Sequence, residues 1–384
     1  MNNHTTDRCE FSIVMPCLNE AETVGDCVKK AILFLKENGI SGEVIVADNG
    51  SIDGSVSIAQ ESGARVVSVG EKGYGSALMG GINAADGEFI IMGDSDGSHD
   101  FLSLMPFVEK LRLGFDLVVG NRFKGGIERY AMSFVNKYIG NPILSSLGRI
   151  FFKSRIKDFH CGLRGFTKRA FERMDLRTTG MEFASEMIVK ATLSGMKVIE
   201  VPTTMSAPGR TRPPHLKPLS DGWRHLRFLL LYSPRWLFLY PGFALMVLGF
   251  AVGITLLPGS ILSLDVHTML YAATGIIIGL QSVSFAILTK VFAMQEKLLP
   301  QHPGLNRLLD IVKLEYSLIF GGLLLLLGLA GTIYAIILIS EGDFSNLGVT
   351  RTMRIIIPSI TLLSVGFQII FTSFFLSILK LKIK

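Results

Sequence analysis

The sequence predicts a water-soluble α/β domain with a mostly parallel sheet, followed by a membrane domain of four helices. In the first half of the chain, short apolar runs alternate with amphipathic stretches. In the second half, four stretches contain no Asp, Glu, Lys or Arg: residues 236–258, 266–289, 316–340 and 355–379. Each is long enough to cross a hydrocarbon core, which takes about 20 helical residues. A mean hydropathy of +0.43 and a charged fraction of 18% agree with a membrane protein and do not fit a purely cytosolic one.

The expected strands are short, β-rich apolar runs at residues 11–16, 43–48, 65–69, 88–93, 117–121 and 197–202. The expected helices are amphipathic stretches at residues 21–38, 55–62, 127–157 and 181–194. Apolar strands that alternate with helices predict a parallel sheet covered on both faces. Asn19, with Glu22 three residues later, is typical of a capping box at the start of the first helix.

Three parts are expected along the chain: a cytoplasmic domain over residues 1–212, an amphipathic interfacial helix over 213–235, and a transmembrane domain over 236–384. The polar first ten residues contain no apolar core of a signal peptide. Lys and Arg occur in the segment 290–315 and in the tail but not in 259–265. The positive-inside rule therefore predicts a multi-pass inner or plasma membrane protein with its catalytic domain and both termini in the cytoplasm. Arg351 and Arg354, at the start of the fourth span, oppose this count.

The charge is divided between two halves of the expected soluble domain. Residues 1–128 hold 10 Lys and Arg against 19 Asp and Glu, whereas residues 129–235 hold 19 against 7. A basic half next to the membrane suggests work on phosphates near a lipid surface, although ordinary juxtamembrane charge has the same appearance. The four cysteines match neither a zinc spacing nor a disulfide framework.

Three polar, acid-bearing turns follow expected strands: residues 16–20, 48–53 and 94–96. Ligands of open α/β sheets bind beyond the carboxyl ends of the strands, so these turns predict a nucleotide and metal site. Neither a Walker lysine motif nor a Gly-x-Gly-x-x-Gly after the first strand is present, which disfavours a P-loop ATPase or a dinucleotide enzyme. Asp94 and Asp96 leave a strand at positions i and i+2, and two such carboxylates can hold Mg²⁺ or Mn²⁺ together with substrate phosphates. The alternative for this pair is a plain polar turn.

Six motifs in order carry a resemblance to a known family: PCLNE at 16–20, DNGSIDGS at 48–55, EKGYGSALMGGI at 71–82, DSDGSHD at 94–100, GNRF at 120–123 and DFHCGLRGF at 158–166. With these motifs, residues 11–205 resemble a family 2 glycosyltransferase of the GT-A fold. Within that family they are most similar to the polyprenyl-phosphate type, represented by dolichyl-phosphate mannose or glucose synthases. The resemblance covers about half of the chain.

The resemblance implies roles for individual residues. It implies nucleotide-sugar contacts at Pro16, Asn19, Glu20, Asp48, Lys72, Gly73 and Asp94. It implies a metal site of Asp94 and Asp96 with Ser98, and catalytic roles for Arg122, Asp158 and Arg164. Candidates for the acceptor phosphate are Lys137, Arg164, Arg210 and Arg212, because guanidinium and ammonium groups offset phosphate charge. Two departures from the family pattern occur: Asn49 replaces the second of two usual aspartates, and Ser98 replaces a frequent glutamine.

The activity implied by the resemblance is inverting transfer of a hexose from a UDP-glucose or GDP-mannose class donor to polyprenyl phosphate, on the cytoplasmic face. The implied partners are this donor, this acceptor, membrane lipid and Mg²⁺ or Mn²⁺, with no nucleic acid; a homo-oligomer is left open. A phosphate acceptor is already anionic and needs no general base, whereas a hydroxyl acceptor needs one. Asp158 or Glu182 could serve as that base, and Glu182 could equally be a helix-face charge. The neighbouring His160 and Cys161 are expected to serve local packing.

Two other functions are less consistent with the sequence. A processive polysaccharide synthase would carry a Gln-x-x-Arg-Trp motif, but Tyr232 stands where the glutamine should be. A non-catalytic transport component that only binds nucleotide sugar would need polar groups inside its spans, and these spans carry almost none that ionise. The membrane-bound hexosyltransferase is therefore the favoured hypothesis.

Overall fold

The structure is a computed structural model that describes residues 9–211, 218–260, 264–296, 298–300, 304, 313–341 and 349–381. It divides into two compact units, Met1–Leu229 and Leu230–Lys384. The strands of the first unit are β1 (Phe11–Cys17), β2 (Gly42–Asp48), β3 (Arg65–Ser68), β4 (Phe89–Met92), β5 (Leu117–Asn121), β6 (Arg164–Thr167) and β7 (Val198–Pro202). Its helices are α1 (Val24–Glu37), α2 (Ser55–Glu61), α3 (Tyr74–Ala84), α4 (Met105–Arg112), α5 (Arg122–Gly125), the π-helical turn η1 (Asn136–Gly140), α6 (Asn141–Phe152), α7 (Lys168–Met174), α8 (Phe183–Leu193) and α9 (Pro218–Leu231), which runs two residues past the division.

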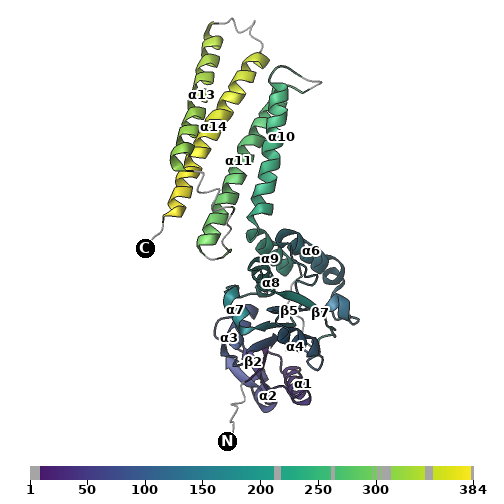
Figure 1. Ribbon diagram of the computed structural model, residues 1–384. Helices are drawn as coiled ribbons and strands as arrows, with labels where there is room; N and C mark the ends of the chain where they lie inside the picture. Colours follow the sequence, from purple (N-terminus) through teal and green to yellow (C-terminus); the bar gives the residue numbers. More distant parts are fainter. Residues whose placement is uncertain are drawn as a thin grey trace. The chain divides into compact units, whose positions relative to one another are not determined.

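The seven strands form one sheet in the order β3-β2-β1-β4-β6-β5-β7. All pairs are parallel except those of β6, which runs antiparallel between β4 and β5. The centre of the sheet is apolar: Ile13, Val14 and Met15 of β1 are fully buried. Burial on both faces explains why this strand is a continuous apolar run rather than an alternating one. Helices α1 to α4 lie around this sheet in Figure 1, and α3 packs against both β1 and β2.

Most of the expected elements are confirmed, and the exceptions have physical causes. The short strand β6 was not expected, because four residues with two neighbours in an antiparallel ladder leave no periodic signal in the sequence. Residues 127–157 do not form one helix: Ile127 makes an isolated bridge with Met205, and helix follows only from η1 to α6. The capping box at Asn19 is wrong. Thr23 is the N-cap of α1, and the Asn19 side chain instead accepts a hydrogen bond from the Ile52 backbone.

In its described residues, the second unit contains the π-helical turn η2 (Arg235–Leu239) and the long apolar helices α10 (Tyr240–Leu256), α11 (Val266–Gln295), α13 (Leu314–Glu341) and α14 (Val349–Lys380). Among the described residues, four segments are long and apolar enough to cross a membrane: Arg235–Leu256, Val266–Gln295, Leu314–Ser340 and Thr350–Lys380. The four expected spans are therefore confirmed as candidates. Figure 1 shows α10 beside α11 and α13 beside α14, and α11 also contacts α14.

Small residues allow the helix pairs of this unit to approach closely. A Cβ added at Gly249 would lie 2.6 Å from the Ala272 carbonyl oxygen, and one added at Gly279 would lie 2.6 Å from the Gly242 carbonyl oxygen. Gly321 makes a similar approach to α14, where its added Cβ would lie 2.7 Å from Ile370. Membrane helices associate through such small-residue contacts because lipid gives them no hydrophobic gain.

Candidate active site

The turns predicted to bind ligand meet at one edge of the sheet. The carboxyl ends of the parallel strands β1, β2, β3, β4 and β5 all lie there. Because β6 is antiparallel, with Arg164 opposite Met92, the segment before it also lies at this edge. The sheet thus brings together the motifs at residues 16–20, 48–55, 71–74, 94–100, 120–123 and 158–164, which are far apart in the sequence.

The turn after β2 is held by its own aspartate. The carboxylate of Asp48 accepts hydrogen bonds from the backbone N–H groups of Gly50 at 3.0 Å and Ser51 at 3.1 Å. The next residue, Asn49, bonds the loop after β3, including the N–H of Gly73. Lys72 Nζ donates to the Asn49 carbonyl oxygen at 2.7 Å. Two of the predicted nucleotide-binding segments are therefore joined directly.

The turn after β1 joins the same network. Asn19 has a left-handed backbone (φ +58°), and its N–H donates to Ser51 Oγ at 2.8 Å. The Pro16 carbonyl oxygen accepts from Ser95 Oγ at 2.7 Å, which links the turn to the loop after β4. Glu20 is largely buried and pairs with Arg210 at 2.6 Å. This geometry brings Pro16, Asn19 and Glu20 to the predicted site.

The loop after β4 presents two carboxylates. Asp94 Oδ1 accepts from the Tyr74 hydroxyl at 2.8 Å, and Asp94 Oδ2 lies 3.2 Å from His99 Nε2. Burial would raise the pKa of Asp94, but the hydrogen bond and charge of His99 and the hydrogen bond of Tyr74 outweigh it and lower that pKa. Asp96 Oδ2 lies 3.3 Å from Arg210 Nη2, and Asp96 Oδ1 accepts from the Ser98 N–H at 3.0 Å.

The donor set at this loop suits a hard divalent cation. Carboxylate oxygens are the ligands that Mg²⁺ prefers, and the side chain of Asp94 remains one-third exposed. No group of three or more His, Cys, Asp or Glu that could hold a metal is found among the described residues. Ser98 is buried, with its N–H on Asp96. Asp94, Asp96 and Ser98 are the side chains with oxygen atoms that a divalent cation would meet at this loop.

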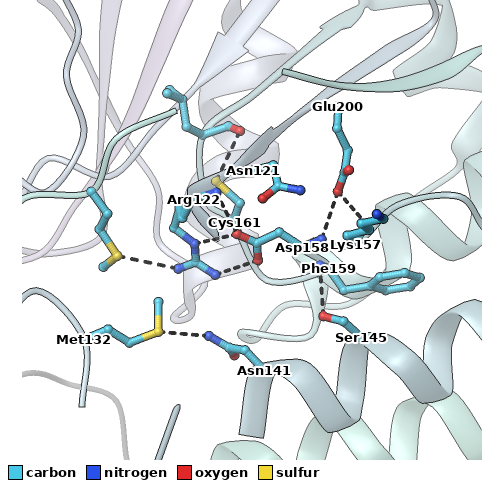
Figure 2. Close-up of polar contacts among 12 residues, drawn as sticks. Asn121, Arg122, Met132, Asn141, Ser145, Lys157, Asp158, Phe159, Cys161 and Glu200 are labelled. Carbon is cyan, nitrogen blue, oxygen red and sulfur yellow. Dashed lines mark hydrogen bonds and ion pairs between the residues drawn. The ribbon is translucent and has the colours of Figure 1, made fainter. Parts of the chain in front are cut away.

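Buried Arg122 and Asp158 form a chain of contacts with Glu200, which is partly buried (Figure 2). Arg122 donates its Nε to Asp158 Oδ2 and its Nη2 to Asp158 Oδ1, both at 2.8 Å, and its backbone N–H also bonds Oδ2. Burial opposes the charge of Arg122, but the Asp158 carboxylate outweighs it and raises the pKa of Arg122. Glu200, from β7, accepts from the backbone N–H groups of Lys157 and Asp158. Both Asp158 oxygens are therefore already bonded.

Arg164 is fully buried, and its guanidinium donates to three backbone carbonyls, those of Cys161, Phe159 and Ala184. Burial lowers the pKa of Arg164 to about 10, so the side chain still carries its charge at neutral pH. Direct contact with an acceptor phosphate would require Arg164 to leave these carbonyls. In this structure it fixes the loop 158–163 and the start of α8.

The remaining acceptor candidates lie in different places. Arg210 bridges Glu20 and Asp96, so it belongs to the candidate site. Lys137 lies in η1, where its Nζ is 5.6 Å from the centroid of the Tyr138 ring. Arg212 lies outside the described residues.

Four residues at the site had no role assigned from the sequence: Asn49, Tyr74, His99 and Glu200. Three of them lie within the quoted motifs, so a signal was present, but their partners come from other loops. Tyr74, for example, starts α3 and reaches the aspartate after β4. Glu200 lies near the end of β7, where strand position is the one available signal.

Comparison with known proteins defines the class. Residues 12–175 match the model of glycosyl transferase family 2, and residues 287–380 match that of the glycosyltransferase family 2 C-terminal transmembrane region. The hexosyltransferase Agl6 of low-salt glycan biosynthesis in Haloferax volcanii is 33% identical over 95% of this chain and 88% of its own length. A dolichol-phosphate mannosyltransferase of Pyrococcus furiosus is 28% identical over 52% of this chain and 58% of its own length. The chain belongs to glycosyltransferase family 2, and the predicted family is confirmed.

The protein is therefore a membrane glycosyltransferase, with a GT-A-like domain followed by four candidate transmembrane helices. Among solved structures, glucosyl-3-phosphoglycerate synthase of Mycobacterium tuberculosis aligns with a TM-score of 0.46 at 23% identity, over 59% of this chain and 80% of the other.

Proposed function

We propose that the protein transfers one hexose, with inversion, from a UDP-glucose or GDP-mannose class donor to polyprenyl phosphate. The observation that carries this proposal is the engagement of Asp158 by Arg122 through three N–H groups. A carboxylate held in this way is poorly placed to take a proton from a hydroxyl acceptor. An anionic phosphate oxygen needs no base, and it is favoured by the basic groups nearby. The similarity to the dolichol-phosphate mannosyltransferase of Pyrococcus furiosus supports this class of acceptor.

Arg122 and Arg210 are the groups we assign to phosphate charge. Arg122 keeps its Nη1 turned to the weakly accepting sulfur of Met205, 3.9 Å away, so a phosphate oxygen can replace this contact. Arg210 lies 3.3 Å from Asp96, so its guanidinium would lie close to a diphosphate bound at that loop. Mg²⁺ or Mn²⁺, held by Asp94 and Asp96 with Ser98 nearby, would offset the charge that develops on the leaving diphosphate. Positioning of both phosphates then supplies most of the catalysis.

An exposed apolar surface supports a lipid acceptor. The segment from residue 130 to the end of α6 leaves large apolar side chains exposed: Tyr130 (80%), Phe134 (71%), Tyr138 (59%), Ile143 (54%) and Ile150 (53%). Monomeric soluble proteins rarely expose such a cluster, which is typical of contact with lipid or a partner. Ser145 of α6 accepts from the Phe159 backbone, so this surface is tied to the loop of Asp158. We propose that this surface and α9 both lie at the bilayer surface. We also propose that the catalytic unit and both termini are in the cytoplasm.

The test is transfer by the purified full-length protein. Radiolabelled UDP- and GDP-hexoses would be incubated with Mg²⁺ or Mn²⁺ and either undecaprenyl phosphate or undecaprenol, and the lipid phase extracted. We expect one hexose per lipid with the phosphate and none with the alcohol. Transfer to undecaprenol, or a polymer, would contradict the proposal. In sealed vesicles, we expect added donor to be used only when the cytoplasmic face is outward; use in right-side-out vesicles would overturn the topology.

A further inference from the structure

Asn49 occupies the position where the family pattern has its second aspartate. Its side-chain amide forms three hydrogen bonds, so nearly all of its hydrogen-bonding capacity is satisfied. Its Nδ2 donates to the carbonyl oxygens of Val69 at 3.0 Å and Glu71 at 2.7 Å. Its Oδ1 accepts from the N–H of Gly73 at 2.8 Å. The residue is 4% exposed. One buried amide thus holds three points of the loop between β3 and α3.

The partners fix which way the amide points. Backbone carbonyls can only accept, and the Gly73 N–H can only donate, so Nδ2 must face Val69 and Glu71. An ionised aspartate has the same shape but two acceptor oxygens. At this position it would set a buried negative oxygen against two carbonyl oxygens, which costs the free energy of unpaired, desolvated acceptors. The loop can keep this geometry with asparagine and not with aspartate.

The loop held in this way connects the two parts of the site. Lys72 Nζ donates a hydrogen bond to the Asn49 carbonyl oxygen. It lies so close to Gly50 that a Cβ added at Gly50 would collide with it. Gly50 also has a positive φ of +92°, which favours glycine. After Gly73, α3 begins with Tyr74, whose hydroxyl bonds Asp94. Asn49 therefore links the turn of Asp48 to the carboxylate that would face the diphosphate.

We propose that Asn49 is a positioning residue of the donor site. It holds the loop 69–73 and the start of α3 in the arrangement that places a bound nucleoside diphosphate next to Asp94. The proposal rests on the proposed use of a nucleotide sugar. The Asn49 amide holds Val69, Glu71 and Gly73, and through this loop it places Lys72 and the start of α3. Loss of the Asn49 amide should therefore weaken binding of the donor and leave binding of the acceptor largely unchanged.

The experiment compares the wild type, Asn49→Asp and Asn38→Asp in the full-length protein. Asn38, at the end of α1, also donates its Nδ2 to a backbone carbonyl, but it precedes β2 and so lies at the opposite edge of the sheet. Binding of UDP and of GDP in the presence of Mn²⁺ would be measured by calorimetry. The KM for donor and acceptor would be measured with the nucleotide sugar that the wild type uses. Asn49→Ser, which keeps one donor and adds no charge, is included in case Asn49→Asp fails to fold.

For Asn49→Asp we expect nucleotide binding weaker and donor KM higher by about tenfold, with acceptor KM within about twofold of the wild type. Asn49→Ser should change the same quantities in the same direction, and Asn38→Asp should match the wild type. Unchanged nucleotide affinity in both Asn49 variants, or an equal rise of both KM values, would overturn the inference. If the wild type binds neither UDP nor GDP, the proposed function itself fails, and this outcome is seen before any variant is compared.

Discussion

At the scale of single residues, the site is defined by which carboxylates are already bonded. Asp158 is held by Arg122, and Asp96 by Arg210 and a backbone N–H. Glu182, which precedes α8, differs from both: its Oε2 is buried and has no hydrogen-bond partner among the residues that the structure describes. Glu182 is therefore the better candidate for a general base if the acceptor were a hydroxyl.

Glu182→Gln distinguishes the two acceptor classes. With polyprenyl phosphate as the acceptor no base is needed, so we expect the transfer rate of this variant to stay within about threefold of the wild type. A loss of about 100-fold or more would indicate base catalysis and would contradict a phosphate acceptor. Glu186→Gln is the control for structural damage, because Glu186 is buried, pairs with Lys190 and accepts from two backbone N–H groups. Its thermal unfolding temperature should fall whichever acceptor is used.

Residue types and their approximate place could be predicted from the sequence, whereas side-chain direction could not. The motifs gave Asp94, Asp96 and Arg122 at the edge where the structure has them. Arg164 was expected at a phosphate but is turned to three carbonyls in the interior. Asn19 was expected to cap a helix but bonds the next turn. The partner of Asn19 lies 33 residues away, and the carbonyls that hold Arg164 combine its own loop with Ala184 of α8, so no local pattern predicts either direction.

At the scale of elements, α9 is joined to the catalytic loop through two histidines. The His225 ring of α9 stacks edge-on against His160, with 4.5 Å between the ring centroids, and His225 Nδ1 lies 3.0 Å from Ser185 Oγ. Burial, with the charges of His225, Arg122 and Arg164, lowers the pKa of His160 well below its usual value. Burial also lowers the pKa of His225, although Glu182 and Asp221 act in the opposite direction. Docked α9 therefore favours both imidazoles neutral.

The neutral state of both histidines predicts that α9 separates more readily from the loop of His160 at acid pH. If α9 separates, both histidines regain a pKa near 6.5 and take up protons more readily, so docking is strongest above about pH 6.5 and weakens as the pH falls below it. We expect hydrogen exchange of residues 218–229, corrected for intrinsic rates, to be faster at pH 5.5 than at pH 7.5. His160→Phe keeps an aromatic ring beside His225 but takes no proton, so its difference should be smaller. Equal protection of the wild type at both values would refute this coupling.

At the scale of the whole molecule, the chain joins a catalytic unit to a membrane unit that has its own polar contact. Arg354 of α14 pairs with Asp265, which precedes α11, at 2.7 Å. The ion pair leaves Arg354 charged, so Arg351 and Arg354 still oppose the positive-inside count, and the cytoplasmic orientation stays a prediction from the basic loop and tail. The four spans and the family could be predicted from the sequence because they depend on composition and on motifs. Contacts such as Asp265–Arg354 could not, since the two residues are 89 positions apart.

The central claim is that sugar transfer takes place at the edge of the sheet that carries Asp94 and the Asp96–Arg210 pair. The most direct measurement is the rate of transfer by Asp96→Asn, with added Mn²⁺, against Asp100→Asn as a matched control. Asp100 lies four residues further along the same loop and bonds Leu102 and Ser103 instead. We predict that Asp96→Asn loses about 100-fold or more of the activity while it stays folded in the membrane, and that Asp100→Asn stays within about threefold. Transfer by Asp96→Asn at the wild-type rate would contradict the account.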